Sequence, residues 1–281
     1  LGLKPGQGKL DTALTVRFEQ RPAPAVASLS IQGGVQLSQL ALTVAHAPAL
    51  GQVEVGWRQF KLDGLDARPL EQQASVASVM LDGLTLKARP VVGAVSPAPD
   101  KAAPVVSPPA SSSSPAWRWS VAKLQLVTDA VDVQTEADAP WPRLDRIQVQ
   151  AGGLTSDPKS APATWQVDVA DQHGAKLHGQ GQIQVAQQHV VAALALDHAH
   201  IPAWLAPIAR GLALPVQIQQ GELAVQTKVD ARFQRDPAIQ WADGVIRLQN
   251  VQTQASSSRV KDQIKVAGLA VDGLSGELSL A

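Results

Sequence analysis

Apolar and polar residues alternate with a period of two along most of this chain. From Leu10 to Phe18 every second residue is apolar or Thr, whereas Lys9, Asp11 and Glu19 occupy the other parity. This alternation is typical of a β-strand with one apolar face and one face in water. The same pattern recurs at residues 25–31, 165–169, 175–185 and 223–233. The sequence therefore predicts a mostly β protein of one-sided antiparallel strands.

The apolar parity changes at several Asp-Gly pairs. In Leu81-Asp82-Gly83-Leu84 the two leucines lie three positions apart, and the unit is nearly repeated at residues 62–65 and 271–274. Gly tolerates the positive φ of a bulge or a tight turn, so each change of parity either bends a long strand or closes a hairpin. Both interpretations stay open. Long strands that bend in this way form curved sheets.

A segment rich in Pro, Ala and Ser divides the chain at residues 93–116. Such a composition buries little area and removes backbone donors, so we expect a flexible linker. It separates a β-rich segment at residues 1–92 from a second one at residues 117–281. One short helix is predicted at residues 202–211, where Pro and Gly provide start and stop signals. We expect this helix to cover one end of an apolar sheet face.

Motifs for catalysis and cofactor binding are missing. Neither a phosphate-binding GxxxxGK[ST] or GxGxxG loop nor a GxSxG elbow occurs, and the chain has no Cys. We read Gly179 and Gly181 as packing positions within a strand. His198 and His200 could share a metal on one strand face, but Asp197 would point to the other face and no third ligand is identified. Two His on a wet strand face is the preferred interpretation, so we expect no catalytic site, no cofactor and no metal.

Composition excludes further classes of function. The 281 residues include 24 Lys+Arg and 24 Asp+Glu, which leaves no charge surplus for nucleic acid. No apolar run approaches the ~20 residues that a membrane-spanning helix needs. Either the protein is soluble, or it is a piece of a longer protein whose targeting segment lies elsewhere.

A series of strand-like motifs with one short helix follows the chain at residues 76–86, 117–126, 131–133, 144–149, 153–154, 175–185, 201–207 and 220–223. This pattern resembles the AsmA-like envelope proteins, and more specifically their large periplasmic branch, which carries a domain of unknown function. The resemblance covers most of the chain, and residues 1–75 would be the end of a preceding repeat. One departure is Trp204 or Leu205 where the family usually has Tyr, and another is the missing N-terminal membrane helix.

The resemblance implies a fragment of a larger protein anchored in the inner membrane of a Gram-negative bacterium. In the periplasm such proteins form a taco-like, curved antiparallel β-groove whose concave face is apolar. Family members are linked to phospholipid movement between inner and outer membrane. The resemblance thus implies phospholipid acyl chains as ligands, outer-membrane components as further partners, and no nucleic acid.

We therefore expect a non-catalytic lipid-binding groove on the apolar strand parity. A closed β-sandwich would bury the same residues against a second sheet, so it remains an alternative fold. Two alternative functions also stay open: an envelope scaffold that assists outer-membrane protein assembly, and a polysaccharide-binding β-sandwich with clustered Trp and paired carboxylates. The candidate groove residues are Leu14, Val16, Phe18, Leu29, Ile31, Leu177, Ile183, Val185, Leu194, Leu196, Leu223, Val225, Val229 and Ile246.

Overall fold

The fold of the chain was obtained as a computed structural model. It describes residues 3–5, 8–20, 27–47, 51–89, 117–133, 143–204, 216–234, 237–255 and 263–279. The strands are β1 (Leu3–Pro5), β2 (Lys9–Glu19), β3 (Ser28–Ala47), β4 (Gly51–Arg68), β5 (Gln73–Arg89), β6 (Arg118–Val133), β7 (Leu144–Thr155), β8 (Ala163–Asp171), β9 (Lys176–Gln184), β10 (His189–His200), β11 (Val216–Arg232), β12 (Ala238–Ala255) and β13 (Gln263–Ser279). Two 3₁₀ turns, η1 (Pro69–Glu71) and η2 (Val185–Gln187), connect β4 to β5 and β9 to β10.

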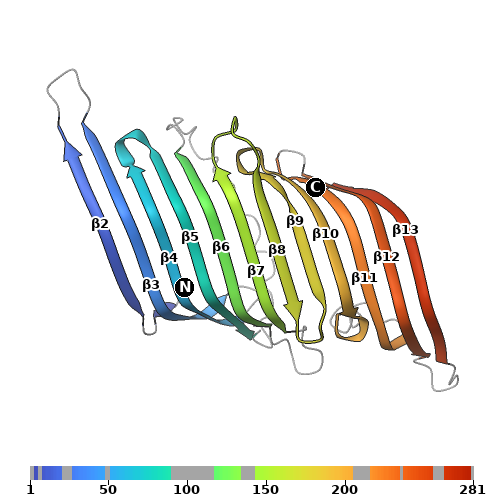
Figure 1. The fold of residues 1–281 in the computed structure, drawn as a ribbon. Helices are drawn as coiled ribbons and strands as arrows, with labels where there is room; N and C mark the ends of the chain where they lie inside the picture. Colours follow the sequence, from blue (N-terminus) through green and yellow to red (C-terminus); the bar gives the residue numbers. More distant parts are fainter. Residues whose placement is uncertain are drawn as a thin grey trace, which may run out of the picture.

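All thirteen strands belong to one sheet (Figure 1). From β3 to β13 neighbours in space are neighbours in sequence, and β1 and β2 both pair with the same side of β3. Every described pair is antiparallel except β5 and β6, which run parallel. The two β-rich segments at residues 1–92 and 117–281 are thus joined through this pair into one sheet. The linker at residues 93–116 lies outside the described residues.

The sheet is open, so the predicted curved antiparallel sheet is confirmed and the closed β-sandwich is wrong. Among the described residues no second sheet covers the first, and β13 does not pair with β1 or β2. The buried apolar residues in this part of the chain are five Ala with Val53 and Ile201, and no large side chain is fully buried. The apolar side chains that a sandwich would bury in its core therefore lie on one face of an open sheet.

The Asp-Gly pairs bend strands and do not close hairpins. Gly64, Gly83 and Gly273 lie inside β4, β5 and β13, with φ of 63°, 65° and 73°. A residue with positive φ inserts a bulge, which changes the side-chain parity and bends the strand. The bending interpretation of the Asp-Gly pairs is confirmed at these three positions.

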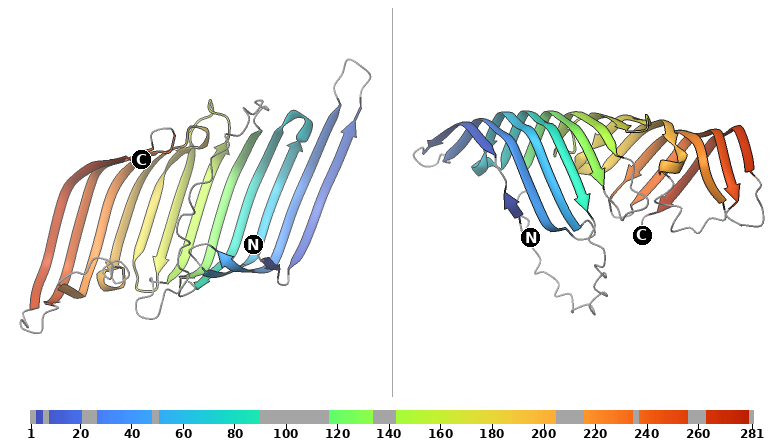
Figure 2. Two further views of the ribbon diagram at one scale, coloured as in Figure 1. Left: turned by 180° about the vertical axis from the view of Figure 1, so that it is seen from behind. Right: turned by 90° about the horizontal axis from the view of Figure 1, so that it is seen from below.

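The parity changes of neighbouring strands occur at the same level. In β3 the change lies at Gln39, whose φ is 55°, and the flanking Leu37 and Leu40 pair with Phe60 and Trp57 of β4. Since both strands change parity together, their apolar side chains stay on one face. Figure 2 shows the result, a sheet bent along its strands into an open trough.

A cluster of charges connects three strands at this bend. The Arg58 guanidinium of β4 donates to Asp82 of β5 at 2.9 Å and to Asp129 of β6 at 3.0 Å. The backbone of Gly83 lies directly beneath Arg58, since a Cβ added there would be 2.6 Å from the Arg58 Cβ. The ion pairs of Arg58 therefore link β4 to both strands of the parallel pair, β5 and β6.

We expect Gly273→Ala to destabilise β13 by about 1–2 kcal/mol, the cost of left-handed backbone for a residue with a Cβ. Gly83→Ala should cost more, because its Cβ also collides with Arg58, whereas no atom lies within 4 Å of the Cβ position at Gly273. Hydrogen exchange of the flanking amides measures both opening free energies. Equal losses at the two sites would contradict the packing of Arg58 on Gly83.

Candidate functional site: the inner face of the trough

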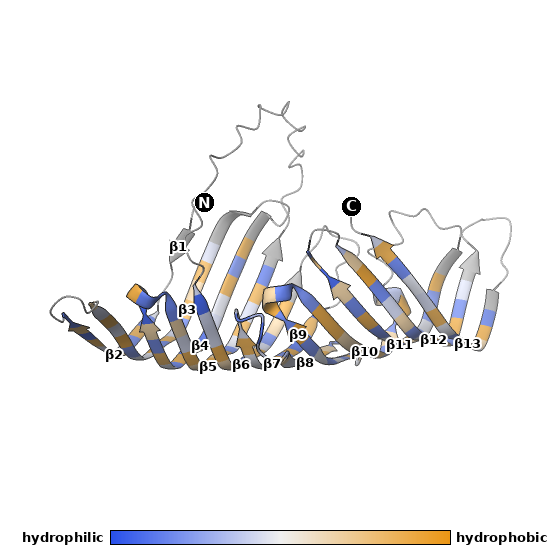
Figure 3. Cartoon of the chain, turned by 90° about the horizontal axis from the view of Figure 1, so that it is seen from above, coloured by the Kyte–Doolittle hydropathy of each residue, from blue (hydrophilic) through white to orange (hydrophobic). Residues whose placement is uncertain are grey.

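The apolar parity of strands β2 to β13 faces the concave side of the trough, which we call the inner face. Asp171 shares the parity of Val167 and Val169, and the Trp204 indole reaches it from the helical turn at residues 201–204. That turn lies on the concave side in Figure 2. Figure 3 shows the sheet from above, with apolar and polar residues alternating along the strands. The polar parity consequently faces outward.

Apolar side chains form unbroken rows across the inner face. Because paired residues of neighbouring strands point to the same side, strand register alone defines these rows. With about 4.8 Å between strands, the twelve strands in line extend the face over about 50 Å. The first row is Leu10, Leu37, Phe60, Leu81, Leu126, Val149, Val167, Gly179 and Leu194, and the second is Ile147, Val169, Leu177, Leu196, Val225, Ile246 and Val271.

Thirteen of the fourteen candidate groove residues lie in strands on this inner face. Five come from β2 and β3: Leu14, Val16, Phe18, Leu29 and Ile31. Eight come from β9 to β12: Leu177, Ile183, Leu194, Leu196, Leu223, Val225, Val229 and Ile246. The exception is Val185, which lies in the turn η2 beyond the end of β9.

Sequence reasoning missed the middle of the face. Phe60, Leu81, Leu126 and Val149 of β4 to β7 contribute to the first row but were not among the candidates. Their strands change parity at bulges, which hides a simple period of two. The recurring Asp-Gly units were the signal that could have found them, once read as bulges and not as strand ends.

The inner face is accessible along its length. The exposed fraction is 63% for Leu10 and 61% for Phe18 on β2, and 52% for Leu269 and 51% for Leu278 on β13. Most apolar side chains of the central strands are half-buried by their neighbours, and no described element packs across them. An uncovered apolar surface of this extent is typical of a binding site.

Small residues shape this face locally. Gly179 stands opposite Val167 and Leu194, and a Cβ added to it would lie 2.8 Å and 3.0 Å from their side chains. The side chains of the neighbouring strands therefore close over the glycine. This confirms Gly179 as a packing position.

The helical turn at residues 201–204 is attached to the end of β8. Asp171 is buried, and its Oδ1 accepts the backbone N–H groups of His173 and Ala175 at 2.8 Å each. Its Oδ2 accepts the indole N–H of Trp204 at 2.9 Å. The helix predicted at residues 202–211 is described only as far as residue 204, and its start does lie at one end of the apolar face.

We expect Trp204→Phe to weaken this attachment by about 1.5–3 kcal/mol, since it removes one hydrogen bond to a carboxylate. Asp171→Ala should cost more, because it also leaves the two backbone donors of the β8–β9 hairpin without an acceptor. Thermal unfolding and hydrogen exchange at His173 and Ala175 compare the two variants. A Trp204→Phe variant that loses as much protection at the hairpin as Asp171→Ala would contradict this division.

The outer face carries polar side chains and small ion pairs. The Asp168 carboxylate of β8 accepts the His178 Nδ1–H at 2.7 Å and the Gln166 amide at 2.9 Å. These hydrogen bonds, that of His178 first, lower the pKa of Asp168 below its ordinary value of 3.8. The ionised carboxylate is thereby favoured in the folded sheet.

A carboxyl group whose pKa is lowered by folding stabilises the fold at pH values above its pKa in the unfolded chain. This contribution disappears as the pH falls through the pKa of the folded state. We therefore expect wild-type protein to exceed Asp168→Asn in stability at neutral pH, with the difference vanishing at pH values below 3.8. The difference should be small because both side chains are exposed to solvent. Thermal unfolding between about pH 5 and about pH 2 measures it. A difference that grew on acidification would reverse the sign of the pKa shift.

The structure separates the two histidines considered for metal binding. His198 has a φ of 54° at a bulge, and its Nδ1 lies 3.1 Å from Glu222 Oε2. The His200 ring instead lies 5.5 Å from that of His173. Within the described ranges no group of three His, Cys, Asp or Glu side chains could hold a metal ion.

Comparison with known proteins gives no match: no protein-family model, no curated protein and no solved structure matches the chain. In the part of the chain that the structure describes, no helix is both long and apolar enough to span a bilayer.

Proposed function

We propose that this chain is a non-catalytic β-groove that holds lipid acyl chains on its inner face and supports phospholipid transport between two membranes. The observation that carries the proposal is the apolar face, which continues from β2 to β13 and which no described element covers. Apolar burial contributes about 25 cal/mol per Å², or about 0.8 kcal/mol per methylene, so hydrocarbon is favoured over water on this surface. A conduit needs no catalytic residue.

The open side of the trough supports transport over storage. A buffering protein encloses its ligand, whereas here the apolar rows reach the edge strands β2 and β13 with their side chains still exposed. An acyl chain on this surface meets similar apolar rows for about 50 Å, at about 4.8 Å per strand. Lipid can therefore move along the trough without leaving hydrocarbon contact.

The cellular setting in the proposal rests on the resemblance to AsmA-like envelope proteins. On that basis the chain is a periplasmic segment of a larger protein anchored in the inner membrane, in a Gram-negative bacterium. Residues 117–126 and 175–185, which carry part of the resemblance, contain the first half of β6 and all of β9 with the start of η2. Their alternating pattern is the one that builds the inner face.

Adjacent residues of one strand provide a direct test. Leu196 points to the inner face, where it pairs with Leu177 and Val225, while Ala195 points outward beside His178 and Gln226. A photo-crosslinking amino acid at position 196 should capture phospholipid in cells or in membrane extracts. The same amino acid at position 195 should not. Equal capture at both positions, or none at position 196, would overturn the proposal.

A charge on the inner face should block lipid without unfolding the sheet. Because the trough is open, the carboxylate of Leu196→Asp stays hydrated in the lipid-free protein, so we expect little change in melting temperature. Co-purified phospholipid, measured by mass spectrometry, should fall to background, whereas Ala195→Asp should retain it. A large loss of stability in Leu196→Asp would instead indicate a closed core.

An envelope scaffold that assists outer-membrane protein assembly is a second candidate. The observation that favours it is the edge strand β13, 17 residues long, which has a strand partner only on the β12 side within the described ranges. Such an edge can template another strand. A strain lacking the protein that showed defective barrel insertion with unchanged lipid distribution would support this function against lipid transport.

A further inference from the structure

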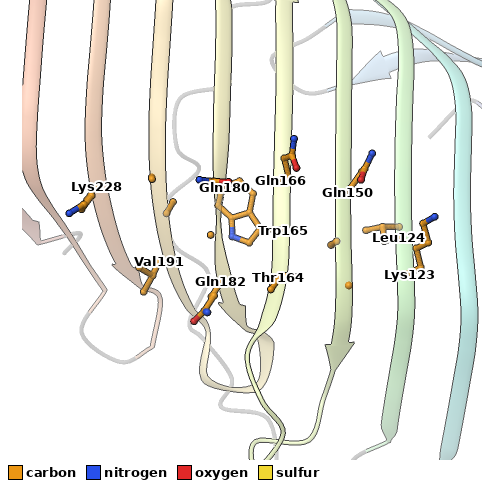
Figure 4. Close-up of a pocket in the computed structure, with 15 residues that line it drawn as sticks. Lys123, Leu124, Gln150, Thr164, Trp165, Gln166, Gln180, Gln182, Val191 and Lys228 are labelled. Atoms are coloured by element: carbon orange, nitrogen blue, oxygen red, sulfur yellow. The ribbon is translucent and has the colours of Figure 1, made fainter.

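A second surface of the sheet has the features of a binding site. On the outer face, opposite the trough, a shallow depression of about 720 Å³ extends across β6 to β11 (Figure 4). This volume lies within the range of about 300–1,000 Å³ typical of ligand sites. Short residues such as Gly152, Thr164 and Ala193 line it together with longer polar side chains, and Leu124, Trp165 and Val191 contribute apolar lining.

Glutamines form a ladder along this depression. Strand register places Gln125 of β6, Gln150 of β7, Gln166 of β8 and Gln180 of β9 in one row. Three of the four, from Gln150 to Gln180, line the depression together with Gln182. Neighbouring amides in the row are spaced by about 4.8 Å, the distance between strands. The row thus offers the same functional group at a regular interval.

The amides of this ladder are available to a ligand. The Gln166 side chain donates to Asp168, but within the described residues the side-chain amides of Gln150, Gln180 and Gln182 make no hydrogen bond. Each primary amide has one carbonyl acceptor and two N–H donors. The depression therefore presents paired donors and acceptors in solvent, without a partner within the sheet.

Charge on this surface is limited. Lys123 at one end has no ion-pair partner in the described part of the chain, and Lys228 at the other end contacts Asp243 at 2.8 Å. The carboxylate of the nearby Asp168 contacts His178 Nδ1 at 2.7 Å. A strongly anionic ligand finds little excess positive charge here, so the chemistry suits a neutral polymer rich in hydroxyl and amide groups.

We propose that the outer face binds a glycan carrying N-acetyl groups, laid across β6 to β11. An acetamido group has one N–H donor and one carbonyl acceptor, which pair reciprocally with a glutamine amide. A peptide is less suited, because peptides dock on sheet edges or in apolar grooves, and the depression lies in the middle of a polar face. The glycan site is independent of the inner face.

Soluble chitin oligosaccharides are the appropriate probe, with cello-oligosaccharides of equal length as the matched sugar without acetamido groups. Isothermal titration calorimetry with the full chain should detect binding of the chitin oligosaccharides. The cello-oligosaccharides should bind with lower affinity. Gln150→Ala combined with Gln180→Ala should lower the affinity about thirtyfold, since two hydrogen bonds of about 1 kcal/mol each are lost and about 1.4 kcal/mol corresponds to tenfold. Ala193→Phe should abolish binding by filling the depression.

Control variants separate this site from the rest of the sheet. Gln226→Ala removes an outer-face amide of β11 that does not line the depression, and it should leave affinity unchanged. Leu196→Asp, which lies on the inner face, should not affect glycan binding either. The tests of lipid binding and of glycan binding can therefore fail independently. Circular dichroism verifies the fold of each variant.

Three results would overturn the proposal. These are no binding of chitin oligosaccharides, equal affinity for both sugars, or undiminished binding in the Ala193→Phe protein. Capture of a peptide by the same Gln150 and Gln180 amides, without glycan binding, would likewise reject the glycan in favour of a protein partner.

Discussion

The structure depends on one constraint, that the apolar side chains described in strands β2 to β13 lie on the same face of a single sheet. Side chains alternate between faces, so a shift of one residue in any strand would send its apolar set to the other side. Bulges also change the parity. They are compatible with the constraint only where neighbouring strands bend at the same level, as β3 and β4 do around Gln39. The curvature of the trough and the continuity of its apolar rows thus have the same origin.

Much of the fold follows from sequence where a strand keeps its period. The regular alternation in β2, β9 and β11 identified both the strands and the residues of their inner face, including Phe18, Leu177 and Val225. Prediction failed where parity changes. Phe60 and Leu126 were missed for this reason, and Val185 was included because its parity continues beyond the end of β9. Local periodicity does not show where a strand ends.

Two global features could not be read from the pattern. An open trough and a closed sandwich use identical alternation, and the difference depends on whether a second layer of chain covers the first. The sequence pattern also does not predict that β5 and β6 pair in parallel, because the alternation along a strand is the same for parallel and antiparallel neighbours. For the outer face, the glutamines of β7, β8 and β9 lie far apart along the chain, and only strand register brings Gln150, Gln166 and Gln180 into one row.

The sequential order of the strands also determines how the protein loses structure. Since almost every strand contacts only its neighbours along the chain and the described residues form no central core, stability is approximately a sum of nearest-neighbour terms, as in solenoid proteins. Within the described residues strands β2 and β13 each pair on one side only, so they should open first, and opening should progress inward strand by strand. The sheet can therefore lose its outer strands while its middle stays folded.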